Sequence, residues 1–129
     1  MVFGHPIANI SDLNVSNAGI WDVAAGRDFF SQRSYYWIDV RDLAVAHVEA
    51  LLRPDAENRR FTVTSPEKMC QQTEADILRQ EFDWAKDVVK KGNEGAPLPK
   101  THGMDGETAQ KVLGLTFRTF KECVVDAVT

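Results

Sequence analysis

One stretch decides the fold, Tyr36-Trp37-Ile38-Asp39-Val40-Arg41-Asp42-Leu43-Ala44-Val45-Ala46-His47, because a strand passes directly into a helix within it. The aromatic and branched residues at its start are typical of a short strand over 35–38. Asp39 then suits the N-cap of a helix over 40–53, and Asp42 adds a negative charge in the first helical turn. Along that helix, His47 lies one turn from two leucines, so we expect it to pack on an apolar face.

The alternation of strand and helix continues on both sides of this stretch. Branched residues favour strands at 1–3 and 61–64, while apolar spacing near 3.6 favours helices. The expected helices cover 12–25, 72–90 and 106–113, and a last helix begins at the capping box Thr119-Phe120-Lys121-Glu122. This alternation predicts an α/β unit with few strands and about five helices. Because so few strands leave open edges, we expect homodimerisation, strand exchange or a partner chain to complete the sheet.

The composition fits a single domain over 1–129. Apolar residues make up 43% of the chain and charged residues 26%, which is close to the average for globular proteins. The 15 basic and 19 acidic residues give a net charge of −4, which argues against general nucleic-acid binding and against a polybasic membrane surface. Glycines and prolines break both regular patterns over 91–106 and predict a long loop there.

Membrane, secreted and metal-binding classes are also disfavoured. No apolar run approaches the roughly 18 residues that span a bilayer, and the first six residues do not resemble a secretory signal. Cys70 and Cys123 are far apart, which argues against a disulfide framework and a cysteine zinc site. The three histidines are scattered, so we expect no metal. The sequence therefore predicts a cytoplasmic protein with reduced thiols.

Four segments resemble the C-terminal part of the extended short-chain dehydrogenases/reductases, in the NAD-dependent epimerase/dehydratase family. The most specific is 36–47, which is close to that family's yIDVRDvAxAH strand and helix. The others, in the family's order, are Val2-Phe3-Gly4-His5-Pro6, Arg60-Phe61-Thr62-Val63-Thr64-Ser65 and the segment 111–122 with its Leu113-Gly114 pair. They are most similar to the fungal carbonyl and methylglyoxal reductases and the plant dihydroflavonol and cinnamoyl-CoA reductases.

The resemblance implies the substrate-binding part of such a reductase, without its cofactor half. The family's GxxGxxG turn, which holds a pyrophosphate at a helix N-terminus, is absent. The segment 103–109 has similar glycine spacing but follows two prolines instead of a strand. The family's catalytic Tyr-x-x-x-Lys is also absent, because Asp39 stands four places after Tyr35 and Val40 four places after Tyr36. We therefore expect no cofactor, and no nicotinamide redox chemistry by this chain alone.

Candidate site residues come from the strand ends, the aromatic strand and the long loop. The candidate hydrogen-bond donors or acid–base groups are His5, Tyr36, Arg41 and His102. The candidate substrate-binding residues are Trp21, Tyr35, Asp39 and Met104, with Phe29-Phe30 adding apolar surface. Each has a structural alternative: a helix cap for Asp39, an ion pair with Asp42 or another acid for Arg41, core packing for the aromatic residues, and a solvated position for His5, His102 and Met104.

These residues support functions of different classes. The first hypothesis is a cofactor-independent enzyme of secondary metabolism that acts on an apolar, oxygenated metabolite by isomerisation, cyclisation (including pericyclic ring closure) or dehydration. The second is a non-catalytic binding protein or pseudoenzyme that associates with a full-length reductase. The third is a fragment of an NADPH-dependent carbonyl reductase that is active only when another chain brings the cofactor half.

Overall fold

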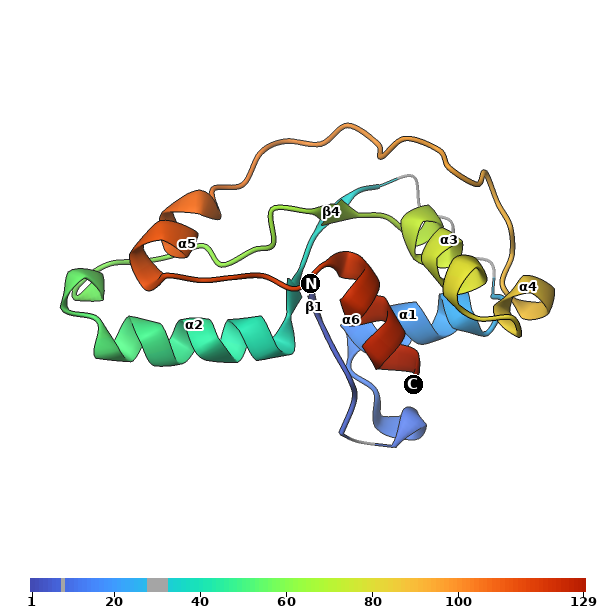
Figure 1. Ribbon diagram of the computed structural model, residues 1–129, viewed down its shortest axis with the longest axis horizontal. Coiled ribbons are helices and arrows are strands. Elements are labelled where there is room, and N and C mark those ends of the chain that lie inside the picture. The colour runs from blue at the N-terminus through green and yellow to red at the C-terminus, as the bar shows by residue number, and fades with distance from the viewer. Residues whose placement is uncertain (8, 28–32) are drawn as a thin grey trace.

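The computed structural model describes residues 1–7, 9–27 and 33–129 and shows a mixed α/β chain with short strands (Figure 1). In the described residues the order of elements is β1 (Val2–Phe3), the 3-10 turn η1 (Ile10–Asp12), α1 (Val15–Ala24), β2 (Tyr35–Tyr36), β3 (Ile38–Asp39), α2 (Val40–Leu52), the 3-10 turn η2 (Pro54–Ala56), β4 (Lys68–Met69), α3 (Gln71–Glu81), α4 (Ala85–Val88), α5 (Glu107–Leu113) and α6 (Phe120–Val128). The expected α/β class is confirmed. No helix or strand covers 91–106, as expected for a long loop.

The described strands form two small sheets. β1 runs parallel to β3, with Phe3 opposite Asp39, and β2 runs antiparallel to β4, with Tyr36 opposite Lys68. Trp37 lies between β2 and β3, so the aromatic stretch contributes to both sheets. The strand expected at 35–38 is therefore divided in two.

The segment 61–64 is not a strand, contrary to expectation. It joins the strands only at its end, where the N–H of Ser65 donates to the carbonyl of Trp37 over 2.8 Å and the hydroxyl of Thr64 does so over 3.2 Å. Its apolar residues, Phe61 and Val63, pack against a small apolar cluster instead of a neighbouring strand. The alternating apolar residues of 61–64 therefore mark a segment with one buried side, but this segment forms no ladder of backbone hydrogen bonds with a neighbouring strand.

The single helix expected over 72–90 is two helices. α3 ends at Glu81, its C-cap Phe82 has an extended backbone (φ −124°, ψ 125°), and α4 begins three residues after Phe82. The guanidinium of Arg79 donates to the carbonyl oxygens of Lys86 at 2.8 Å and Val89 at 2.7 Å, which caps the second helix from the side. This break raises the count to six α-helices among the described residues, against about five expected.

Helix ends are where the structure follows the sequence most closely. The carboxylate of Asp39 accepts from the N–H of Arg41 at 2.8 Å and caps α2. Thr119 and Glu122 form the expected reciprocal capping box of α6. Gly114, with φ +66°, ends α5 in the left-handed conformation that glycine adopts without strain.

The core consists of two apolar clusters. The larger one lies among α1, α3, α6 and β1, and in it the rings of Trp37 and Phe120 are 4.9 Å apart. The smaller one lies between α2, α5 and η2. His47 is exposed, contrary to expectation, because the side of α2 that packs on the smaller cluster carries Asp42 and Ala46.

Membrane and metal features are not found in the part of the chain that the structure describes. No described helix is both long enough and apolar enough to cross a membrane. Among the same residues there is no group of three or more His, Cys, Asp or Glu placed to hold a metal ion. Cys70 and Cys123 are buried free thiols. Phe29 and Phe30 lie outside the described residues.

Candidate functional site

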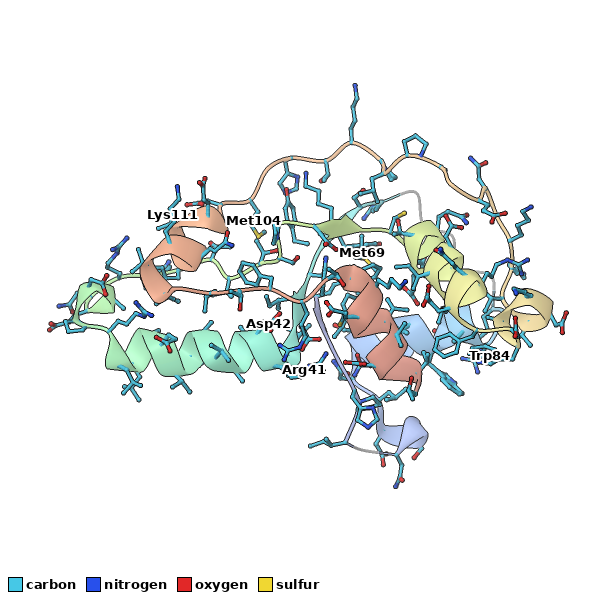
Figure 2. All side chains as sticks on the ribbon, viewed as in Figure 1. Arg41, Asp42, Met69, Trp84, Met104 and Lys111 are labelled. Atoms are coloured by element: carbon cyan, nitrogen blue, oxygen red, sulfur yellow. The ribbon has the colours of Figure 1, made fainter. Side chains whose placement is uncertain are left out.

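A cleft lies where β2, β4, the long loop and α5 meet, and we call it the Tyr36 cleft. Its volume is about 490 Å³. Its lining residues are Tyr36, Thr64, Ser65, Pro66, Lys68, Gly103, Met104, Gly106, Glu107, Gln110 and Phe117. Figure 2 shows Met104 on the loop beside α5, above the start of α2 where Arg41 and Asp42 lie. The long loop therefore closes one side of this cleft.

Two predicted site residues, Tyr36 and Met104, line the Tyr36 cleft, and a third, His102, lies against the Tyr36 ring. The ring of His102 lies 5.8 Å from that of Tyr36, centroid to centroid, at a tilt of 48°. The ammonium of Lys68, opposite Tyr36 in the β2–β4 pair, lies 5.4 Å from the centre of the same ring. A cation over an aromatic face is attracted to its π electrons. This contact therefore keeps the side chains of Lys68 and Tyr36 together in the lining of the cleft.

The hydroxyl of Tyr36 is the unsatisfied polar group of this cleft. Its oxygen is buried and has no hydrogen-bond partner among the described residues. Buried polar atoms in folded proteins are nearly always bonded, so this unpaired hydroxyl is an exception, and a movement of the side chain has to expose it before a ligand can reach it. A phenol can donate to a carbonyl oxygen or accept from a hydroxyl.

Asp39 and Arg41 lie apart from the Tyr36 cleft, in an ion-pair network at the start of α2. The guanidinium of Arg41 donates to both carboxylate oxygens of Asp39, at 2.9 and 2.7 Å, and to Asp126 of α6 at 2.6 Å. Burial opposes ionisation of Asp39, but the hydrogen bonds from Arg41 hold the pKa of this carboxyl below its ordinary value. Both oxygens of the fully buried Asp39 are thus already occupied by the chain itself.

Two neighbouring side chains extend this network. Burial raises the pKa of the Cys123 thiol, and its contact with Asp39 raises it further, so this cysteine stays protonated. Asp42 accepts from the N–H of Arg118 at 2.8 Å and also from its guanidinium. The acids of the Asp39–Asp42 stretch therefore connect α2 to the C-terminal segment.

His5 and Trp21 line a different cleft, of about 200 Å³, between α1 and the end of α6. Nδ1 of His5 lies 2.9 Å from the carbonyl oxygen of Asp126. Because a carbonyl only accepts, Nδ1 carries the proton of this contact. Asn17, in the same cleft, donates to the carbonyl of Gly4 at 3.1 Å, and its buried Oδ1 has no partner among the described residues.

The remaining candidate, Tyr35, is half-buried and packs against the larger apolar cluster. The eight candidates therefore fall into separate places and not into one site. Sequence reasoning missed five polar residues of the Tyr36 cleft, which are Thr64, Ser65, Lys68, Glu107 and Gln110. The signal for Lys68 would have been its pairing with Tyr36, but no short hairpin turn joins β2 to β4 and reveals it.

The resemblance to reductases implies a nicotinamide dinucleotide, but the starts of α5 and α2 do not fit its pyrophosphate. Gly106, at the start of the seven-residue α5, packs on segment 61–64, where an added Cβ would lie 2.8 Å from the carbonyl oxygen of Thr64. The N-terminus of α2 is already filled by the carboxylate of Asp39. A phosphate there would meet a negative charge instead of free N–H groups.

Comparisons with known proteins agree with the fold and with the partial coverage. No protein-family model matches the chain. The ketoreductase azaE of Aspergillus niger is 34% identical over 137 residues, which cover 100% of this chain and 40% of the ketoreductase. The chain thus spans about two fifths of the length of this relative.

Solved structures match over nearly the whole chain. Gre2 of Candida albicans has a TM-score of 0.84 and 25% identity, covering 99% of this chain and 40% of that structure. The yeast methylglyoxal/isovaleraldehyde reductase Gre2, complexed with NADPH, has a TM-score of 0.79 and 26% identity, covering 98% of this chain and 42% of that structure. These 129 residues are therefore homologous to part of the fungal Gre2-type reductases and have the short-chain dehydrogenase/reductase fold of that part.

Proposed function

We propose that these residues form the substrate-binding part of a Gre2-type carbonyl reductase, and that the dinucleotide is held by polypeptide that they do not span. The observation that carries the proposal is the Tyr36 cleft with its unpaired buried hydroxyl. Support comes from the matched relatives, one of which is named as a methylglyoxal/isovaleraldehyde reductase in complex with NADPH.

The chemistry of the cleft suits a small carbonyl compound with an apolar chain. Met104 and Phe117 supply apolar surface, and Thr64 and Gln110 supply polar groups. In our proposal the Tyr36 side chain shifts when substrate binds and exposes its buried hydroxyl, which then donates to the carbonyl oxygen of the substrate. The charge of Lys68 nearby favours an electron-rich oxygen there. A cleft of mostly apolar surface with a few placed polar groups is the usual form of a small-molecule site.

The cofactor-independent isomerase, cyclase or dehydratase depends on the same cleft and makes the opposite prediction. It requires turnover of a substrate without NADPH, whereas the substrate-binding part of a reductase requires binding without turnover until NADPH is brought by other polypeptide. His5 and Arg41 are bound to Asp126 and lie outside the Tyr36 cleft, so we assign no step in it to them. Homodimer formation and a cytoplasmic location stay predictions.

Binding of isovaleraldehyde to the chain tests the proposal, with ligand-observed NMR as the measurement. We expect Tyr36→Phe to weaken binding by roughly 2- to 10-fold, the factor for one hydrogen bond worth about 0.5–1.5 kcal/mol. Tyr35→Phe is the matched control, because its ring packs on the core, and it should bind as the wild-type chain does. Equal binding by the Tyr36→Phe variant, or tight NADPH binding by these residues alone, would refute the proposal.

A further inference from the structure

Lys68 places a positive charge in the lining of the Tyr36 cleft. In the β2–β4 pair it lies opposite Tyr36, and side chains opposite each other in an antiparallel pair project to the same side of the sheet. The ammonium of Lys68 accordingly lies 5.4 Å from the centre of the Tyr36 ring, and both residues line the cleft. Strand pairing therefore positions this charge beside the place proposed for the substrate carbonyl.

The half-buried Lys68 forms no ion pair with an acid of the described residues. Its neighbour in the chain, Glu67, accepts from the N–H of Phe120 at 2.8 Å. The acid in the lining, Glu107, pairs with Lys111 at 2.5 Å. The chain has 19 acidic and 15 basic residues, so a shortage of acids does not explain the missing partner. A partly desolvated cation without a counter-charge favours an anionic ligand.

Uncharged donors accompany this ammonium in the same cleft. The side-chain amide of Gln110, on α5, forms no hydrogen bond with a described residue. The hydroxyl of Ser65 accepts from the N–H of Glu67 at 3.2 Å, and its own proton is bonded to no described residue. A carboxylate accepts several hydrogen bonds at once, and those from a charged donor are the strongest. One cation with uncharged donors around it is thus a set that suits a carboxylate.

We propose that Lys68 makes the Tyr36 cleft select carbonyl compounds that carry a carboxylate next to the carbonyl group, which are small aliphatic α-keto acids. This inference rests on the proposed function. A single C–C bond joins the carboxylate and the carbonyl of an α-keto acid, so a carboxylate bound at Lys68 brings the carbonyl oxygen close to Tyr36. Met104 and Phe117 supply apolar surface for the aliphatic chain.

Three ligands with the same aliphatic chain test this selection. Isovaleraldehyde has a hydrogen on its carbonyl carbon, α-ketoisocaproate has a carboxylate there, and the diketone acetyl isovaleryl has an uncharged acetyl group of similar shape. We expect the chain to bind the keto acid roughly 5- to 20-fold more tightly than the diketone, the factor for one partly exposed hydrogen bond to a charged group. Ligand-observed NMR at physiological ionic strength measures this ratio, because salt then screens charges beyond about 8 Å.

Variants of Lys68 assign the selection to this residue. Lys68→Met removes the charge from a side chain of similar length, so the preference for the keto acid over the diketone should disappear, whereas Lys68→Arg keeps a positive charge and should keep the preference. Lys121→Met is the matched control, because it changes the net charge equally but Lys121 pairs with Glu81 at 2.8 Å, outside the lining of the cleft. Thermal unfolding of each variant checks that it is folded.

The outcomes separate this inference from the proposed function. Equal binding of the keto acid and the diketone by the wild-type chain would overturn the selection, as would a preference that Lys68→Met retains or that Lys121→Met removes. If Tyr36→Phe still weakens isovaleraldehyde binding in that case, the proposed function stands. A preference that Lys68→Met abolishes, together with isovaleraldehyde binding that Tyr36→Phe leaves unchanged, would support the selection and reject the role of the Tyr36 hydroxyl.

Discussion

Asp39 lies in the segment 36–47 that most resembles the reductase family, yet its carboxylate is not free to bind a ligand. It is fully buried, caps α2 and binds the guanidinium of Arg41 through both oxygens. Each of these contacts favours the charged carboxylate and leaves no oxygen free for a ligand. The sequence predicted the cap, because an acid before an apolar helix is a local signal. The pairing of Arg41 with Asp126 depends on the position of α6, which no local pattern contains.

Within this network, substitution of the buried Asp39 should lower the free energy of unfolding more than substitution of the partly exposed Asp126. Asp39→Asn keeps a helix cap but removes the buried charge that Arg41 pairs with, so we expect it to lower the free energy of unfolding by roughly 1–3 kcal/mol. Asp126→Asn changes a carboxylate that is 43% exposed, and we expect less than about 1 kcal/mol. Urea unfolding of both variants measures the difference, and equal losses would show that burial of Asp39 carries no special weight.

Glu74 of α3 is a buried carboxyl group whose ionisation the folded chain opposes. Burial raises the pKa of this carboxyl in α3 well above its ordinary value of 4.5, and Oε1 has no hydrogen-bond partner among the described residues. The unfolded chain releases the proton near pH 4.5 while the folded chain keeps it. The stability that depends on this group is therefore fully present below pH 4.5 and is lost as the pH rises through the folded pKa.

Glu74→Gln should remove that loss, because an amide does not ionise. We expect the free energy of unfolding of the variant at pH 8 to exceed that of the wild-type chain by roughly 1–3 kcal/mol, with little difference at pH 4. Urea unfolding at the two pH values measures this, and Glu57→Gln is the control because Glu57 is exposed. A gain of the same size at both pH values would contradict the assignment to ionisation.

At the scale of elements, the sequence predicted helix ends better than strands. Capping residues and Gly114 act within one turn, so local sequence is enough to place them. The strand expected at 61–64 failed because Phe61 and Val63 have a buried side but no strand beside them. The helix expected over 72–90 failed because Arg79 caps α4 through contacts that bend the chain back at Phe82. In both places the tertiary surroundings of the segment, and not its local sequence pattern, decide the structure.

Two glycines in helical segments should respond in opposite directions to alanine. Gly114 has φ +66°, and an added Cβ would lie 2.7 Å from the guanidinium of Arg53, so we expect Gly114→Ala to destabilise the chain by about 1 kcal/mol. Gly19 lies inside α1 with open space at the Cβ position, so Gly19→Ala should stabilise by about 0.5–1 kcal/mol. Melting temperatures measure both, and a loss of stability in Gly19→Ala would mean that the helix carries a constraint not visible in its packing.

At the scale of the whole molecule, the candidate site depends on segments far apart in the chain. Tyr36 was predicted from its strand, and His102 and Met104 from the loop, but only the path of that loop brings them together. Composition located the loop correctly, because its glycines and prolines break regular structure. The polar residues opposite Tyr36 could not be found in this way, since strand pairing at long range leaves no periodic trace in either strand.

Hydrogen bonds to neighbouring elements hold the first part of the loop. The amide of Gln72 donates to the carbonyl of Lys91 at 2.9 Å and accepts from the N–H of Asn93 at 2.8 Å. The N–H of Gly95 donates to Asp76 at 2.9 Å, and the hydroxyl of Ser34 donates to the carbonyl of Pro99 at 2.8 Å. Beyond Pro99 the exposed Lys100 follows before His102 reaches the ring of Tyr36. Exposed loop positions with few backbone bonds are the preferred sites of proteolytic cleavage. We therefore expect limited trypsin digestion to cut first after Lys100.

The cut chain should stay assembled, because the fragment after Lys100 carries α5, which packs on α2, and α6, which packs on α1 and α3. Size-exclusion chromatography of the digest should give one species that contains both fragments, and Lys100→Gln should block the cut. Separation of the fragments without denaturant would mean that the connection through the loop, and not the packing of α6 in the larger cluster, holds the C-terminal helices in place. Assembly without that connection would show that the Tyr36 cleft is positioned by the two apolar clusters, with the loop as its cover.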